Sequence, residues 1–127
     1  MTEKQIENDF RKALRQSGWI EEKNHGSIAQ FGRPDLHVGH QQHGECWIEM
    51  KRPGGKLGSK QFTWMLKWHQ VARVLVMDSA DVALLERLLK QGSHGPPQWS
   101  PWMTAKQKRE LRTGRSSLSG ALEAWSA

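Results

Sequence analysis

Three charged side chains lie in two short segments of this sequence that otherwise resemble β-strands. Asp35 opens one segment, and Glu49 and Lys51 lie two residues apart around the apolar run Cys46–Met50. Because strand side chains alternate between faces, Glu49 and Lys51 point to the same side. A hairpin turn around Gln42 would make Asp35 the cross-strand neighbour of Glu49. Two carboxylates so close repel each other unless a cation lies between them. The pattern therefore predicts a divalent metal site, with an ammonium beside it, that receives a phosphate.

The same three residues also have a structural explanation. An Asp after a Pro, as in Pro34-Asp35, is an ordinary turn pair. Glu49 and Lys51 would then be a solvated pair on the surface of a strand. The choice between the two interpretations depends on the flanking segments, which have to position these groups.

The first flanking segment is an amphipathic helix predicted for residues 3 to 17. Thr2 caps it, Gly18 ends it, and its apolar face consists of Ile6, Phe10, Ala13, Leu14 and Ser17. Two acids, Glu3 and Glu7, lie on or beside this apolar face. A carboxylate in the capping turn suits the helix dipole, which accounts for Glu3 better than for Glu7. Either acid could belong to the metal site.

The second flanking segment is a glycine-containing basic loop, Pro53–Gly58, followed by a helix. The helix is predicted from Lys60 to about Ala72 with Ser59 as its cap, which places Gln61 in its first turn. Glycines let a backbone approach a phosphodiester chain closely. The predicted phosphate-binding residues around the site are Arg33, Arg52, Lys56 and Lys60.

The remaining pattern predicts an α/β domain with a mixed sheet flanked by helices, in the order α-β-β-β-α-β-α. Residues 19–23 fit either a short strand or an extension of the first helix. The expected strands are Ser27–Phe31, Asp35–His40, Glu45–Met50 and Val74–Met77, the last apolar enough to be buried on both faces. A final helix runs from Ala80 to Gln91, capped by Ser79 and stopped by Gly92.

A domain boundary is predicted at residues 92–93, because Ser93–Pro97 breaks the pattern. Residues 1–92 would form the first domain and residues 93–127 a partly helical tail. The tail contains a basic helix from Thr104 to Arg112 and an amphipathic end with Leu118, Leu122 and Trp125. It could fold back on the core, dimerise or contact nucleic acid.

Composition narrows the class of partner. The chain has 127 residues, a net charge of +6 and a pI near 9.8, which favours a polyanion such as nucleic acid. No segment approaches the roughly 18 apolar residues of a membrane span, and no signal peptide is visible, so a cytoplasmic protein is expected.

The single cysteine, Cys46, fits a buried inert thiol. A zinc site at His37, His40 and His43 is disfavoured, because strand spacing sends the first two to opposite faces. For the seven tryptophans, core packing is a commoner use than stacking on bases.

With these elements in place, the chain resembles the PD-(D/E)xK nuclease superfamily, and within it the small phage-type VRR-NUC (virus-type replication-repair nuclease) domains. The resemblance covers residues 3 to 91 and rests on the helix acid, Gly32-Arg33-Pro34-Asp35, Ile48-Glu49-Met50-Lys51-Arg52-Pro53-Gly54 and the downstream Gln61. Glu7 is favoured over Glu3 as the helix acid, because its spacing to Phe10, Leu14 and Gly18 is similar to that in archaeal Holliday-junction resolvases. The family implies a restriction-endonuclease-like core and hydrolysis of DNA phosphodiester bonds with Mg²⁺ or Mn²⁺.

The resemblance also implies roles for individual residues. Asp35, Glu49 and the carbonyl of Met50 would bind the metal, joined by Glu7 or Glu3 directly or through water. Lys51 would position the attacking water and offset charge on the phosphorus, and Gln61 would orient Lys51 or that water.

The expected function is therefore a structure-selective endonuclease acting on branched DNA such as four-way junctions. Such an enzyme would act as a homodimer, in the cytoplasm of a bacterial host if it is phage-encoded. The alternatives are a non-catalytic nucleic-acid-binding module or an accessory subunit of a helicase or packaging complex.

Overall fold

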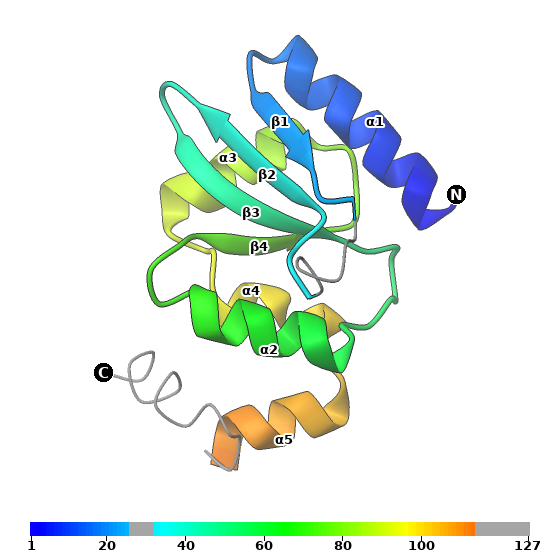
Figure 1. The fold of residues 1–127 in the computed structure, drawn as a ribbon, viewed down its shortest axis with the longest axis vertical. Coiled ribbons are helices and arrows are strands. Elements are labelled where there is room, and N and C mark those ends of the chain that lie inside the picture. Colours follow the sequence, from blue (N-terminus) through cyan, green and yellow to red (C-terminus); the bar gives the residue numbers. More distant parts are fainter. Residues whose placement is uncertain (26–31, 114–127) are drawn as a thin grey trace.

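The protein is an α/β domain built on one four-stranded mixed sheet. A computed structural model describes residues 1–25 and 32–113 and has the predicted order of helices and strands (Figure 1). The elements are α1 (Glu3–Gln16), β1 (Ile20–Lys23), β2 (Leu36–His40), β3 (Gly44–Met50), α2 (Ser59–Trp68), β4 (Val74–Met77), α3 (Val82–Gln91), α4 (Pro96–Trp99), the 3-10 turn η2 (Ser100–Trp102) and α5 (Ala105–Thr113).

The strands lie in the order β1-β2-β3-β4. The β1–β2 and β2–β3 pairs are antiparallel, and β4 runs parallel to β3. The β2–β3 register pairs Leu36 with Ile48, which confirms the predicted hairpin around Gln42. One further step along both strands places Asp35 opposite Glu49. The register thus brings the two acids together.

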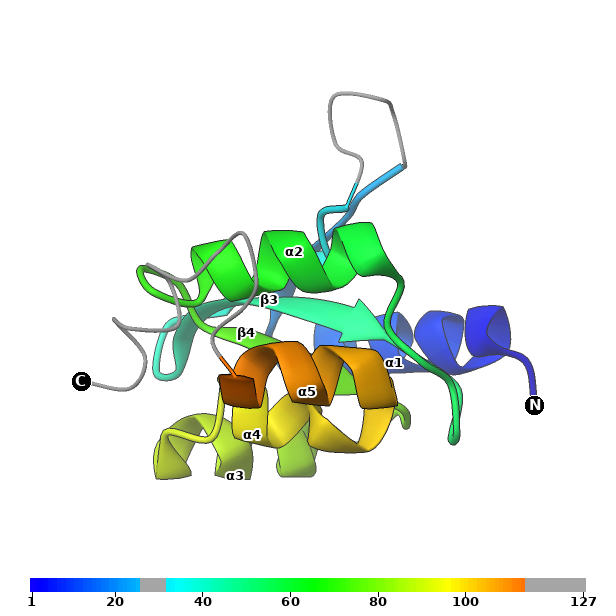
Figure 2. The same ribbon diagram turned by 90° about the horizontal axis from the view of Figure 1, so that it is seen from below.

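Helices cover both faces of the sheet, and Figure 2 shows α2 on one side and α3 on the other. The residues of β2 and β3 that alternate with the two acids form a core with α1 and α3. This first core includes Leu36, Val38, Cys46, Ile48 and Met50. On the opposite face, a second core joins α2 and β4 to the C-terminal segment. All four residues of β4 are buried, as predicted for a strand covered on both faces.

The capping predictions hold at two helix ends. Thr2 forms a capping box with Gln5 at the start of α1. Gly92 ends α3 in the left-handed conformation, with φ of 73°.

The cap predicted for α2 is wrong. Ser59 is the first helical residue, and Gly58 is the cap because the side chain of Gln61 accepts a hydrogen bond from its backbone N–H. The helix also ends at Trp68, earlier than the predicted Ala72.

The cap predicted for α3 is wrong as well. Asp81 caps the helix instead of Ser79, since its side chain accepts a hydrogen bond from the Leu84 N–H.

The segment left open by the sequence pattern, residues 19–23, contains strand β1, which pairs with β2 at one edge of the sheet. The strand predicted for Ser27–Phe31 lies outside the described residues. So does the amphipathic end with Leu118, Leu122 and Trp125.

The C-terminal segment folds back on the core and covers the free edge of β4. The side chain of Gln98 donates to the carbonyl of Val76 and accepts from its N–H, at 2.7 and 2.8 Å. Trp99 is fully buried and donates from its indole N–H to the carbonyl of Val74. Edge strands expose unpaired backbone groups that favour aggregation, and these two side chains satisfy them. The expectation that the tail folds back on the core is therefore confirmed up to Thr113. The domain division at residue 92 stays a prediction.

In residues 1–25 and 32–113, no helix has both the length and the apolar character that crossing a membrane requires.

The edge contact predicts a specific loss of stability. Gln98→Ala leaves the N–H and C=O of Val76 without these partners, so we expect unfolding free energy to fall by about 1–3 kcal/mol. Urea unfolding followed by circular dichroism measures this. Gln70→Ala is the control, because the exposed Gln70 makes a local bond to the Lys67 carbonyl and none to the β4 edge within the described residues. Equal stability of the two variants would show that the edge contact contributes little.

Candidate active site

The two predicted acids lie side by side on the face of the sheet that α2 covers. Glu49 is in β3 and only 1% exposed, whereas Asp35 precedes β2 and is partly exposed. The Oδ2 atom of Asp35 accepts a hydrogen bond from the backbone N–H of Met50, at 2.8 Å. This contact fixes the Asp35 carboxylate to the end of the strand that carries Glu49.

The chain before Asp35 is held against the start of α2. Gly32 has a φ of 90°, and a Cβ at this position would lie 2.9 Å from the backbone carbonyl of Lys60. Only glycine accommodates both the conformation and the close approach. Pro34 is buried. Gly32 therefore lets the segment that ends in Asp35 pass directly over the first turn of α2.

Lys51 and Gln61 complete a connected set of polar groups around Glu49. Lys51 donates to Gln61 Oε1 at 2.9 Å, and Gln61 donates from Nε2 to Glu49 Oε2 at 3.0 Å. The Lys51 Nζ atom lies 3.7 Å from the same Glu49 oxygen. Both Lys51 and Glu49 are buried, at 9% and 1% exposure. The structure thus brings together Asp35, Glu49, Lys51 and Gln61.

Glu49 sits in an environment that disfavours its charge. Burial raises its pKa well above the ordinary value of 4.5, and the neighbouring Asp35 raises it further. The Lys51 ammonium opposes both effects, and Glu3 adds a smaller repulsion. Protonated Glu49 can share its proton with Asp35, whereas ionised Glu49 has an excess of nearby negative charge.

The two carboxylates fit a hard divalent cation. Glu49 Oε1 is buried and accepts no hydrogen bond within the part of the chain that the structure describes. No third Asp, Glu, His or Cys side chain there is placed to complete a metal cluster. Mg²⁺ often binds through only one or two carboxylates, with waters and substrate oxygens filling its other positions. Asp35 and Glu49 offer that donor set, and the Met50 carbonyl is the predicted backbone ligand.

The two helix acids have different surroundings. Glu7 is buried and forms an ion pair with Lys23, at the end of β1. Glu3 is exposed, yet close enough to Glu49 to influence its pKa. A metal-binding role for either acid stays a prediction. Lys23 itself was missed from the sequence, because the pattern left its segment undecided between helix and strand.

A cleft of about 650 Å³ opens over this site. Its lining includes Asp35 and Gln61 together with four cationic side chains, Arg33, Lys51, Lys56 and Lys60. Three of the four predicted phosphate-binding residues therefore line the same cleft, whereas Arg52 is exposed and does not line it. Asn24, which sequence reasoning did not identify, also lines it and donates to the Arg33 carbonyl. The local sequence around Asn24 carried no signal for this position.

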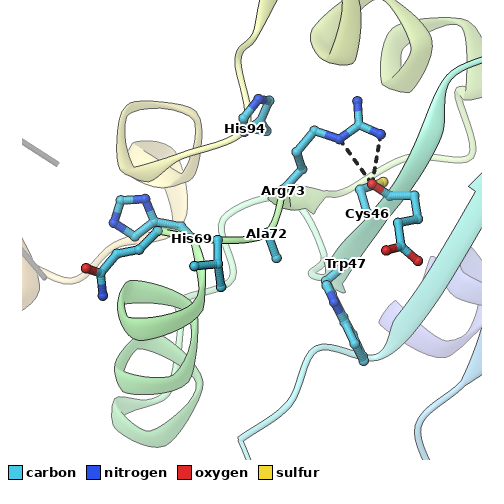
Figure 3. A pocket seen from close by; sticks show the side chains of 9 residues that line it. Cys46, Trp47, His69, Ala72, Arg73 and His94 are labelled. Atoms are coloured by element: carbon cyan, nitrogen blue, oxygen red, sulfur yellow. Dashed lines mark hydrogen bonds between the residues drawn. The ribbon is translucent and has the colours of Figure 1, made fainter. Parts of the chain in front are cut away.

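A second cavity of about 470 Å³ lies around the start of β3 and the loop between α2 and β4 (Figure 3). The Arg73 guanidinium donates to the carbonyl of Glu45 on this side. Burial raises the pKa of the Cys46 thiol to about 12 and lowers the pKa values of His69 and His94. The thiol is buried, as predicted, and its raised pKa favours the protonated form at neutral pH. Arg73 holds the hairpin through its bonds to the Glu45 carbonyl.

The chain matches no family model and no curated protein.

The raised pKa of Glu49 predicts a pH-dependent gain in stability for Glu49→Gln in metal-free protein. As pH rises above 4.5, the unfolded chain loses this proton before the folded protein does, so the wild type loses stability until its folded pKa is passed. Gln carries no such penalty. We expect the variant to unfold about 4 °C higher at pH 8 for each 1 kcal/mol of relieved penalty, and at the same temperature as wild type near pH 4.

Thermal unfolding in EDTA measures this, with Glu45→Gln as the control in the same strand, since that side chain is 77% exposed. Adding Mn²⁺ should stabilise the wild type but not Glu49→Gln. A variant that is less stable than wild type at pH 8 would contradict the assignment.

Proposed function

We propose that this protein is a metal-dependent endonuclease that hydrolyses DNA phosphodiester bonds. The observation that carries the proposal is the joining of Asp35, buried Glu49 and buried Lys51 at the base of a cleft with a cationic lining. Holding a buried carboxylate beside a second carboxylate costs free energy, and a fold retains such a cost most often at a functional site.

Each side chain has a distinct part in this chemistry. Asp35 and Glu49 would hold Mg²⁺ or Mn²⁺, which when bound lowers the pKa of water and polarises phosphoryl oxygens. Lys51 is held by Gln61 so that its ammonium faces the carboxylate site, where it offsets negative charge that builds on the phosphate oxygens. Gln61 in turn is fixed by the Gly58 N–H and by Glu49.

In this proposal, the cleft binds the phosphates of the DNA backbone and makes no contact with base edges. Arg33, Lys56 and Lys60 are suited to phosphate contacts, which set affinity and position but carry no sequence information. We propose that selectivity lies in DNA shape, such as a branch, because phosphate contacts of this kind carry no sequence information. Symmetric cutting of a four-way junction would need two sites and therefore a homodimer.

Lys51→Met tests the chemical role of the ammonium. We expect the cleavage rate at saturating DNA to fall by about 10²–10³, because one charge-stabilising group in a partly dehydrated site contributes about that much. DNA affinity should change little. The measurement is single-turnover cleavage of a labelled four-way junction with Mg²⁺ or Mn²⁺, alongside binding of the same DNA in EDTA.

Arg33→Ala is the contrasting variant. It removes an exposed cation at the rim of the cleft, so we expect weaker binding, a salt dependence of log K reduced by about 1, and an unchanged rate at saturation. Parallel losses of binding and rate in Lys51→Met would reassign Lys51 to simple phosphate binding. No cleavage of linear, flapped or four-way DNA by the wild type with either metal would overturn the proposed activity.

A further inference from the structure

Four aromatic rings form a continuous row beside the candidate site. Each ring contacts the next: His37 stacks on Trp47 with centroids 4.2 Å apart, Trp47 meets Trp64 edge-on at 5.4 Å, and Trp64 stacks on Trp68 at 5.5 Å. We call this set the aromatic row. It runs from β2 across β3 to the outer side of α2.

The aromatic row continues from the acid pair on the same surface. His37 and Trp47 are register partners, two residues from Asp35 and Glu49 respectively, so both pairs share one face of the sheet. Two residues along a strand is about 7 Å. On α2, Trp64 and Trp68 follow Gln61 at helical spacing. The site and the row are therefore adjacent on both elements.

Core packing explains only the middle of the row. Trp47 and Trp64 are partly buried and pack against the second core. The two ends extend beyond it: Trp68 is 40% exposed, and the side chain of His37 is 37% exposed. A row that served only to cover the core would not need either exposed end.

Charge is distributed unevenly along the two sides of the row. Lys60 and Lys67 are exposed on α2, beside Trp64 and Trp68, and Lys60 also lines the cleft. On the hairpin side, His37 is paired with Glu45. A polyanionic backbone would thus follow α2, with its bases turned toward the rings.

We infer that the aromatic row is a stacking platform for unpaired bases of a nucleic acid strand whose phosphate lies in the cleft. Bases stack on aromatic side chains whatever their sequence, and a basic groove that follows the backbone completes such a surface. The inference rests on the proposed function, and it specifies the substrate as DNA with a single-stranded arm next to the cut.

Trp68→Ala tests the platform, because this ring is exposed enough to be removed without opening the core. The probes are labelled oligothymidylate and a blunt duplex of equal length, bound in EDTA so that nothing is cut. We expect affinity for oligothymidylate to fall about tenfold and affinity for the duplex to stay within about twofold. Trp68→Phe keeps a ring and should retain most of the affinity. Val71→Ala, an exposed apolar residue just after α2 and outside the row, is the control and should change neither.

Three results would overturn the inference: unchanged oligothymidylate binding in Trp68→Ala, equal losses on both probes, or equal losses in Trp68→Ala and Val71→Ala. A wild-type dimer that Trp68→Ala converts to a monomer in sedimentation, with binding unchanged, would assign the row to a second copy of the chain. Binding is measured without a divalent cation, so it does not depend on cleavage. If the wild type cut no DNA, the proposed activity would be overturned, but the binding result for the aromatic row would still hold.

Discussion

The close approach of Glu49 to Asp35 is the constraint on which the rest of this architecture depends. Burial and a neighbouring carboxylate both oppose ionisation of Glu49, so the pair lowers the free energy of unfolding at neutral pH. The hairpin register holds the acids opposite each other, and the Met50 N–H fixes one of them. Gly32 lets the chain approach α2 closely enough to reach that position. Local structure is thus arranged to maintain an unfavourable contact, which is reasonable if a cation relieves it.

Gln61 links the chemistry of the site to the folding of α2. Its side-chain oxygen accepts from the Gly58 N–H, which satisfies a backbone donor before the helix, and also from Lys51. Its amide nitrogen donates to Glu49. A single side chain therefore begins the helix, holds the ammonium and orients a carboxylate. Because the same helix carries Trp64 and Trp68, its placement by Gln61 also sets the aromatic row relative to the acids.

The parts of this structure that the sequence predicts are those governed by local periodicity. The hairpin register follows from two alternating strands and a short turn, and α1 follows from its apolar spacing and Thr2 cap. Residues 19–23 were too short and too polar to decide between strand and helix. Glu7 and the β4 edge have partners that are distant in the chain, Lys23 and Gln98 respectively. The local sequence around these two residues carries no signal for the contacts. The cap predictions failed where a second suitable residue lay two positions away, as at Ser79 and Asp81, or where a side chain three residues later supplied the bond, as Gln61 does for Gly58.

The proposed recognition follows from which groups the surface lacks as much as from those it has. Reading a base pair requires donors and acceptors aimed at base edges within a groove, usually from a helix or ribbon that enters it. In the described residues, the cleft presents four cations together with Asp35 and a few short polar side chains, and the row offers ring faces. Cations contact every phosphate equally, and ring faces accept every base, but inside a duplex the base faces are covered by their neighbours, whereas an unpaired base can lie flat on a tryptophan. Under the proposed function, discrimination would arise from the strandedness of DNA near the scissile phosphate, and the geometry of α2 against β3 would then determine substrate choice.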